Sequence, residues 1–137
     1  MTVAPEVNTF RRRFERTITR LNVRLESHEI LLLSNVFGTV SWRFQDLGLQ
    51  MFLVIDSNPP RLELRGEPGK APIIHLMMDS GLLDSAIENK LSFVEAFLCG
   101  RLGVTGANPL QLTKFIHLLS PLLESYREAS QVANVET

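Results

Sequence analysis

The fold is decided by the stretch Phe93-Val-Glu-Ala-Phe97-Leu-Cys-Gly100-Arg-Leu-Gly-Val104-Thr-Gly106-Ala-Asn108-Pro109-Leu-Gln-Leu112-Thr-Lys-Phe115-Ile-His-Leu-Leu119. Phe93 and Phe97 suit one face of a short helix, which Gly100 can end with a left-handed cap. Leu102 and Val104 then alternate with their neighbours, as they would in a half-buried strand. The stretch therefore predicts a helix, a glycine and a short strand over residues 101–105.

A second helix is predicted directly after this strand. Gly106 turns the chain, Asn108 is a good N-cap and Pro109 fits the first helical position. The long apolar segment that follows contains Pro121, which has no backbone N–H and clashes with the preceding turn. We therefore expect a kink or a restart of the helix at Ser120-Pro121.

Upstream, four segments have the character of strands. Residues 39–44 and 61–65 alternate with a period of two, residues 50–55 are a β-favouring run, and residues 72–78 are expected to be a fourth strand. Val40, Trp42 and Phe44 alternate with polar residues in the first of them. Because short turns join the segments, they are expected to form an antiparallel meander. The strand residues expected to supply the core are Met51, Leu53, Ile55, Leu62, Leu64, Ile73 and Met77.

Helices are expected on either side of the strands. An N-terminal helix starts near Thr9, and residues 28–37 either extend it or form a second helix after a bend near Ser27. Asp79 and Ser80 are predicted caps for a helix over residues 82–88, and Ser92 caps the next one. The residues expected on the buried stripe of the first helix are Phe10, Phe14, Ile18, Leu21 and Leu25.

The length of 137 residues suits one domain with a real core. We expect this domain over residues 9–130, after a flexible lead (1–8) and before a loose tail (131–137). No run approaches the ~20 apolar residues of a membrane-spanning helix, and the N-terminus lacks the plan of a signal peptide. Cys99 is the single cysteine, which leaves no internal disulfide. A cytoplasmic location is the expectation.

Positive charge is concentrated near the N-terminus of a chain with a formal net charge of −1. The arginines concerned are Arg11, Arg12, Arg13, Arg16, Arg20 and Arg24. A solvated face over a packed stripe explains them more simply than a specific binding role, because arginine stems also cover apolar surface. Nucleic-acid binding is not expected, since acids outnumber bases from Glu29 onward.

The sequence offers little catalytic chemistry. None of its three histidines has a partner at metal-ligand spacing, so no metal site is expected. His75, Asp79 and Ser80 could be imagined as a triad, but no nucleophile elbow is present. His75 is better interpreted as a sheet residue and Asp79 as a helix cap. We therefore predict no catalytic residue and no cofactor.

The order of elements, together with Ala96-Phe97 and Gly100-Arg101-Leu102-x-Val104-x-Gly106, resembles the sterol carrier protein type 2 domain family. Asn108 and Leu110 follow as in the opening of that family's last helix. Ala107 departs from the family, in which Asp or Asn is common after the glycine. The N-terminal helix is also unusually rich in arginine.

The resemblance implies an α+β fold: a five-stranded, mostly antiparallel sheet covered by helices, with an apolar tunnel. Composition favours a packed core without a cavity, and the resemblance reverses that expectation. It implies non-enzymatic binding of a fatty-acyl, sterol or isoprenoid/quinone-type ligand, in some relatives as an accessory factor of quinone biosynthesis. The residues expected to line the site are Leu83, Ile87, Phe93, Phe97, Leu102, Val104, Phe115, Ile116, Leu119, Leu122 and Leu123.

With a lipid ligand in view, the arginine-rich helix is predicted to bring Arg12, Arg16 and Arg20 to an anionic membrane surface. A protein partner in lipid or quinone metabolism is a further expectation. Two other hypotheses remain open. The domain could be a scaffold or dimerisation module for a biosynthetic enzyme, or a small isomerase that uses His75 or His117 in an apolar pocket.

Overall fold

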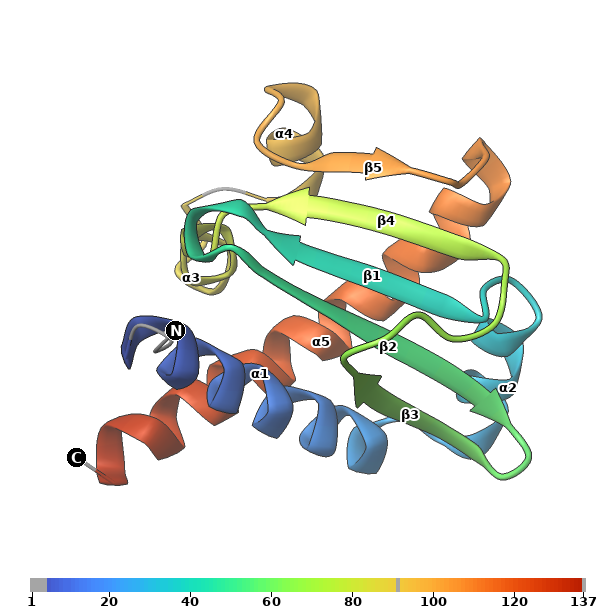
Figure 1. Ribbon diagram of the computed structural model, residues 1–137, viewed down its shortest axis with the longest axis horizontal. Coiled ribbons are helices and arrows are strands. Elements are labelled where there is room, and N and C mark those ends of the chain that lie inside the picture. Colours follow the sequence, from blue (N-terminus) through green and yellow to red (C-terminus); the bar gives the residue numbers. More distant parts are fainter. Residues whose placement is uncertain (1–4, 91, 137) are drawn as a thin grey trace.

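The computed structural model describes residues 5–90 and 92–136, and the side chains of residues 7–90 and 92–131. The elements in chain order are α1 (Pro5–Arg24), α2 (Ser27–Ser34), β1 (Thr39–Phe44), the short 3-10 helix η1 (Gln45–Leu47), β2 (Leu49–Ser57), β3 (Pro60–Arg65), β4 (Ile73–Met78), α3 (Gly81–Ile87), α4 (Phe93–Leu98), β5 (Gly103–Thr105) and α5 (Pro109–Glu136). The predicted α+β class and the five strands are confirmed (Figure 1).

The sheet has the order β3-β2-β1-β4-β5, with antiparallel pairs except for the parallel pair β1–β4. The predicted meander is therefore right for β1, β2 and β3 but wrong for β4. Residues 66–72 carry the chain back across the sheet, where the Thr39 hydroxyl donates to the Lys70 carbonyl at 2.9 Å. A Cβ at Gly69 would lie 2.7 Å from Val54 Cγ2, so the absent side chain permits this close crossing.

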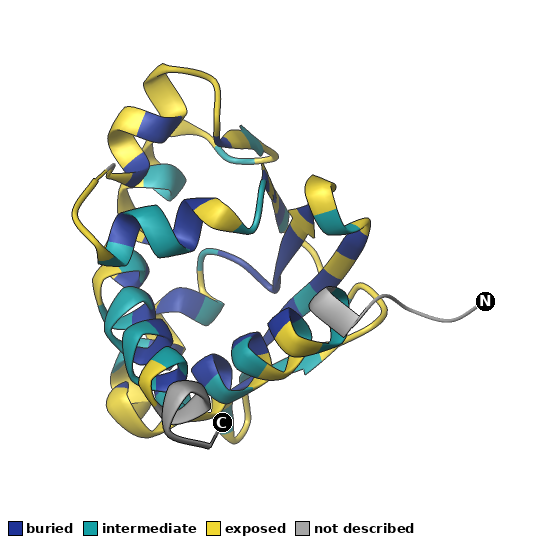
Figure 2. Ribbon diagram, turned by 90° about the vertical axis from the view of Figure 1, so that its left-hand side faces the viewer, coloured by how far each residue is buried: buried dark blue, intermediate teal, exposed yellow. Residues whose placement is uncertain are grey.

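Helices α1, α2 and α5 cover one face of the sheet, and the apolar core lies between the two layers (Figures 1 and 2). Trp42, in the central strand, is fully buried in this core. The sequence placed Ile73 and Met77 inward, which is wrong: the register with β1 turns Ile74, Leu76 and Met78 to the core. His75 is the polar residue of β4 and shares a strand face with Ile73 and Met77, so its exposed position was a local sign that this face points away from the core.

The N-terminal segment forms two helices. α1 begins at Pro5, before the predicted Thr9, and its predicted stripe is buried throughout. α2 is separate from α1, as one of the two alternatives had it. A capping box at its start, in which Glu26 and Glu29 each accept the other's backbone N–H, explains the break near Ser27.

Helix α5 is continuous through Pro121, so the helix does not restart at Ser120-Pro121. It also extends to Glu136, into the segment that we expected to be a loose tail. Burial of α5 against α1, in which the Phe10 and Tyr126 rings lie 6.5 Å apart, favours the continuous helix over the local cost of the proline. The domain limits at 9 and 130 remain predictions.

The predicted caps are confirmed where they flank the deciding stretch. Ser92 accepts the Glu95 N–H at 3.1 Å, and Asn108 accepts the Gln111 N–H at 2.8 Å. Ser80 is at the predicted N-cap position of α3, but its hydroxyl donates to Asp46 at 2.6 Å and makes no capping hydrogen bond.

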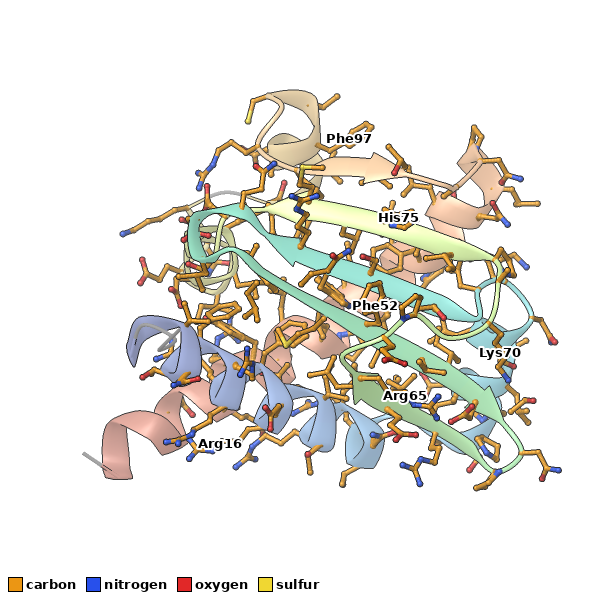
Figure 3. All side chains as sticks on the ribbon, in the orientation of Figure 1. Arg16, Phe52, Arg65, Lys70, His75 and Phe97 are labelled. Atoms are coloured by element: carbon orange, nitrogen blue, oxygen red, sulfur yellow. The ribbon has the colours of Figure 1, made fainter. Side chains whose placement is uncertain are left out.

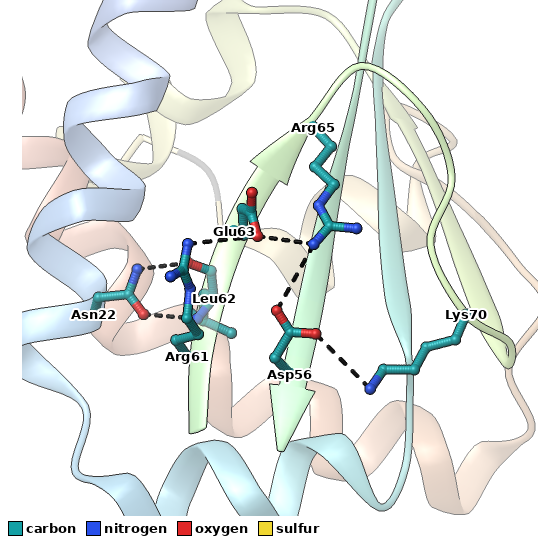
Figure 4. Close-up of polar contacts among 7 residues, drawn as sticks. All are labelled: Asn22, Asp56, Arg61, Leu62, Glu63, Arg65 and Lys70. Atoms are coloured by element: carbon teal, nitrogen blue, oxygen red, sulfur yellow. Dashed lines mark hydrogen bonds and ion pairs between the residues drawn. The ribbon is translucent and has the colours of Figure 1, made fainter. Parts of the chain in front are cut away.

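The edge strand β3 is closed by one side chain of α1. The Asn22 amide donates to the Leu62 carbonyl at 2.7 Å and accepts the Leu62 N–H at 2.7 Å (Figure 4). An unpaired strand edge is open to intermolecular pairing, which this clamp blocks at Leu62. Beyond it, Asp56 lies between the cations of Arg65 and Lys70 on the surface (Figure 4).

Asn22→Ala is therefore expected to destabilise the protein by about 2 kcal/mol, because two hydrogen bonds in a half-buried setting are lost. Urea denaturation measures the change. Val23→Ala, at a neighbouring position that is 85% exposed, is the control and should change stability by less than about 0.5 kcal/mol. Equal effects of the two substitutions would contradict the clamp.

Candidate functional site: two apolar grooves beside helix α5

Two glycines of the deciding stretch set the geometry of the site. Gly100 has φ +84° and ends α4, and Gly106 has φ +86° and turns the chain between β5 and α5. Between them Val104 pairs with Leu76, so β5 extends the sheet at its β4 edge. As a result α4, β5 and the first turns of α5 enclose an apolar space.

This space, the α4–α5 groove, has a volume of about 130 Å³. It is lined by Phe93, Val94, Phe97, Leu102, Val104, Leu112, Phe115, Ile116 and Leu119. Most of these residues belong to the predicted set; the sequence missed Val94 and Leu112. Leu112 precedes Phe115 and Leu119 at helical spacing, a signal that could have found it.

Four predicted lining residues lie outside the α4–α5 groove. Leu83 and Leu122 are fully buried in the core, and Ile87 and Leu123 pack against it. The reason is that α3 packs directly on the C-terminal half of α5 and leaves no space there.

A second space, the α2–α5 groove, lies on the other flank of α5 and has a volume of about 350 Å³. It is lined by Leu25, Glu29, Leu32, Leu33, Val36, Lys114, His117 and Leu118. Sequence reasoning missed it entirely. One signal was available: Leu31, Leu32 and Leu33 are consecutive in a short helix that buries only one face, and Leu32 is 63% exposed.

The two grooves differ in polarity. The described residues that line the α4–α5 groove include no titratable side chain. The α2–α5 groove carries Glu29, Lys114 and His117 together with its aliphatic residues. Both spaces therefore suit an apolar ligand, and the α2–α5 groove also offers contacts to a polar end.

The polar groups considered for catalysis are not brought together. His75 lies on the sheet face opposite the helices, beside Ser41 and Arg43 (Figure 3). Asp79 is 3.5 Å from Arg101, and Ser80 binds Asp46, so the imagined triad does not form. His117 is exposed at the α2–α5 groove.

Tyr126 is a buried titratable group on α5. Burial raises the pKa of Tyr126 to about 12, and its hydroxyl donates to Asp84 at 3.0 Å. Arg13 lies beside both groups, with Nη1 3.8 Å from the Asp84 carboxylate. This cluster joins α1, α3 and α5 and lines neither groove, so its role is to hold the helices together.

One group of metal-ligating side chains was not expected from the sequence. The ligand atoms of Glu26, His28 and Glu29 lie within 4.8 Å of one another at the start of α2. All three residues are accessible to solvent, and both carboxylates already take part in the capping box. The arrangement is explained by the helix start.

Five of the six arginines of α1 fall into two groups. Arg13 and Arg24 reach the acids Asp84 and Glu128 on neighbouring helices. Arg12, Arg16 and Arg20 instead lie along one surface of α1, which packs at the β3 edge of the sheet. Figure 3 shows Arg16 and Phe97 at opposite ends of the molecule, so this surface is remote from the α4–α5 groove.

Among the helices that the structure describes, none has the length and apolar character that crossing a bilayer requires. No protein-family model and no curated protein sequence matches the chain.

Solved structures do match it. Sterol carrier protein 2 from Yarrowia lipolytica, in its apo form, superposes with a TM-score of 0.57 at 15% identity, over 90% of this chain and 98% of that one. The ubiquinone synthesis protein UbiJ-SCP2 gives 0.57 at 15% identity, over 90% and 96%. The sec-alkylsulfatase Pisa1 from Pseudomonas sp. gives 0.54 at 21% identity over 72% of this chain, which spans 15% of the sulfatase. The chain therefore has the fold of the sterol carrier protein 2 domain.

Proposed function

We propose that this protein is a non-enzymatic carrier that holds a long apolar chain of fatty-acyl, sterol or isoprenoid/quinone type in the grooves beside α5. The observation that carries the proposal is the α4–α5 groove, whose described lining is entirely apolar within a sterol carrier protein 2 fold. Binding would be driven by transfer of the ligand from water, at ~0.8 kcal/mol per buried CH₂.

Ligand capture tests this function directly. Mass spectrometry of gently extracted recombinant protein is expected to detect a co-purified lipid, and the emptied protein should take up fluorescent fatty-acid or quinone analogues. The quinone probe is included because UbiJ-SCP2, a structural neighbour, is named for ubiquinone synthesis. Absence of both co-purified lipid and uptake would refute the proposal. The proposal includes a cytoplasmic role as an accessory factor in lipid or quinone biosynthesis.

Contact with anionic membranes would use Arg12, Arg16 and Arg20. Each basic residue near such a surface contributes ~1 kcal/mol, so replacing all three by Glu should weaken binding to anionic liposomes on the order of a hundredfold. Liposome co-sedimentation at low and high salt measures the effect, since screening should reduce it. The charge-matched control replaces Arg43, Lys90 and Arg101 by Glu, because these residues belong to neither α1 nor β3. Unchanged binding of the α1 variant would refute the contact.

A second candidate function, a dimerisation or scaffold module, is favoured by one observation. α4 leaves three apolar side chains accessible to solvent, with Val94 56%, Phe97 46% and Leu98 78% exposed, and Leu98 is not part of the groove lining. Analytical ultracentrifugation of the wild type and of Leu98→Asp decides between the functions. A dimer that Leu98→Asp dissociates, in a protein that takes up no lipid, would support the module.

A further inference from the structure

We propose that the two grooves are the ends of one channel beneath α5 and that Phe115 is the partition between them, which sets the length of chain that the protein can hold. This inference rests on the proposed function and adds a residue that determines specificity. It concerns a single flexible acyl or prenyl chain rather than a rigid ring system.

The positions of the lining residues on α5 place the grooves on opposite flanks of one helix. Successive residues of an α-helix are rotated by ~100°. Lys114 and His117 therefore share one flank, where they line the α2–α5 groove, while Ile116 and Leu119 share the other, where they line the α4–α5 groove. Phe115 lies between these flanks, on the side of α5 that faces the sheet.

Aromatic rings fill the space between this side of α5 and the sheet. The Phe115 ring centroid lies 6.3 Å from that of Phe37 and 6.4 Å from that of Trp42. Phe37 directly follows Val36, which lines the α2–α5 groove, whereas Phe115 lines the α4–α5 groove. Phe37 lies in the connection between α2 and β1, and Phe115 lies on α5, so the contact between their rings forms part of the wall that we place between the two spaces.

The core beside this wall contains a polar group without a partner. The indole Nε1 of Trp42 is buried and has no hydrogen-bond partner among the described residues. A buried donor without an acceptor is unfavourable, so Trp42 marks a place in the core where packing leaves a polar group unsatisfied.

The volumes of the two grooves indicate which part of the ligand each groove would hold. Small-molecule sites usually measure ~300–1,000 Å³, a range that includes the α2–α5 groove at about 350 Å³. The α4–α5 groove, at about 130 Å³, has room only for the end of a chain. A chain would therefore lie mainly in the α2–α5 groove and reach the α4–α5 groove once Phe115 gives way.

The test measures dissociation constants of saturated fatty acids of increasing length. In the wild type, affinity should rise about fourfold per added methylene and then level off where the chain meets Phe115. In Phe115→Ala the rise should continue for several more carbons. Trp42 is the single tryptophan, so fatty acids brominated at their terminal carbon should quench its fluorescence once the chain reaches the partition. With longer chains the quenching should persist in the wild type and decrease in Phe115→Ala, because the terminal carbon then passes Trp42 into the α4–α5 groove.

Leu122→Ala is the matched control, since Leu122 is fully buried and lines neither groove. It should leave the break point of the wild type unchanged. Phe115→Leu, a milder change, should move the break in the same direction as Phe115→Ala and covers the case in which the alanine variant does not fold. An unmoved break point in both Phe115 variants would overturn the partition while leaving the carrier function intact. If the wild type bound no fatty acid at all, both the carrier function and the partition would be overturned.

Discussion

Replacing Phe115 by glutamate is expected to abolish lipid uptake. The Phe115 side chain is 3% exposed and lies at the wall between the two grooves. A carboxylate there would be desolvated without a cationic partner, which costs several kcal/mol and makes the apolar space unsuitable for a chain. Titration with a fluorescent fatty acid measures uptake, and far-UV circular dichroism shows whether the variant is folded.

Ile116→Glu separates loss of the site from loss of the fold. Ile116 is 44% exposed yet lines the α4–α5 groove, so its substitution should leave the protein folded and weaken uptake about tenfold. Thr113→Glu, an exposed position of the same helix that lines neither groove, is the control and should bind as the wild type does. Full uptake by a folded Ile116→Glu protein would contradict a ligand in this groove.

Gly106→Ala is expected to destabilise the protein by more than about 3 kcal/mol, as measured by urea denaturation. Gly106 has φ +86°, a conformation that costs an L-residue roughly 1–2 kcal/mol. In addition, its new Cβ would lie 2.4 Å from the Ile73 carbonyl oxygen, well inside van der Waals contact. The chain would have to move away from β4, which would weaken the pairing of β5 and open one wall of the α4–α5 groove.

Gly100→Ala is the matched comparison because it separates backbone strain from the steric clash. Gly100 has nearly the same φ, +84°, but no atom within 4 Å of the Cβ position. Its substitution should therefore cost only the strain, about 1–2 kcal/mol. Equal losses of stability in the two variants would show that the contact with Ile73 is unimportant.

The elements of the deciding stretch could be predicted because their signals are local. The glycines at 100 and 106 are required by backbone conformations that a side chain disfavours, and Ser92 and Asn108 cap helices within three residues of themselves. The predicted lining of the α4–α5 groove follows from the same stretch, because its helices and strand meet through short connections.

The parts that could not be predicted depend on contacts between distant residues. The place of β4 beside β1 follows from the crossing of residues 66–72, which no local pattern specifies. Within β4, a strand that is otherwise apolar, only His75 indicated that Ile73 and Met77 face away from the core. The residues expected around Leu83 and Leu122 fill the core, because α3 packs on α5 in a way that their spacing does not specify.

The sequence by itself determined the helix–glycine–strand–glycine–helix order of residues 93–119 and the apolar character of the space that it encloses. Those properties depend on hydrogen bonds and backbone angles within a few residues. Only the tertiary structure decided that the larger groove lies between α2 and α5, that Phe115 lies between the two flanks of α5 that line the grooves, and that Arg12, Arg16 and Arg20 lie at the other end of the sheet. Each of these depends on how segments that are far apart in the sequence pack against one another, and side-chain periodicity within one segment does not specify that packing.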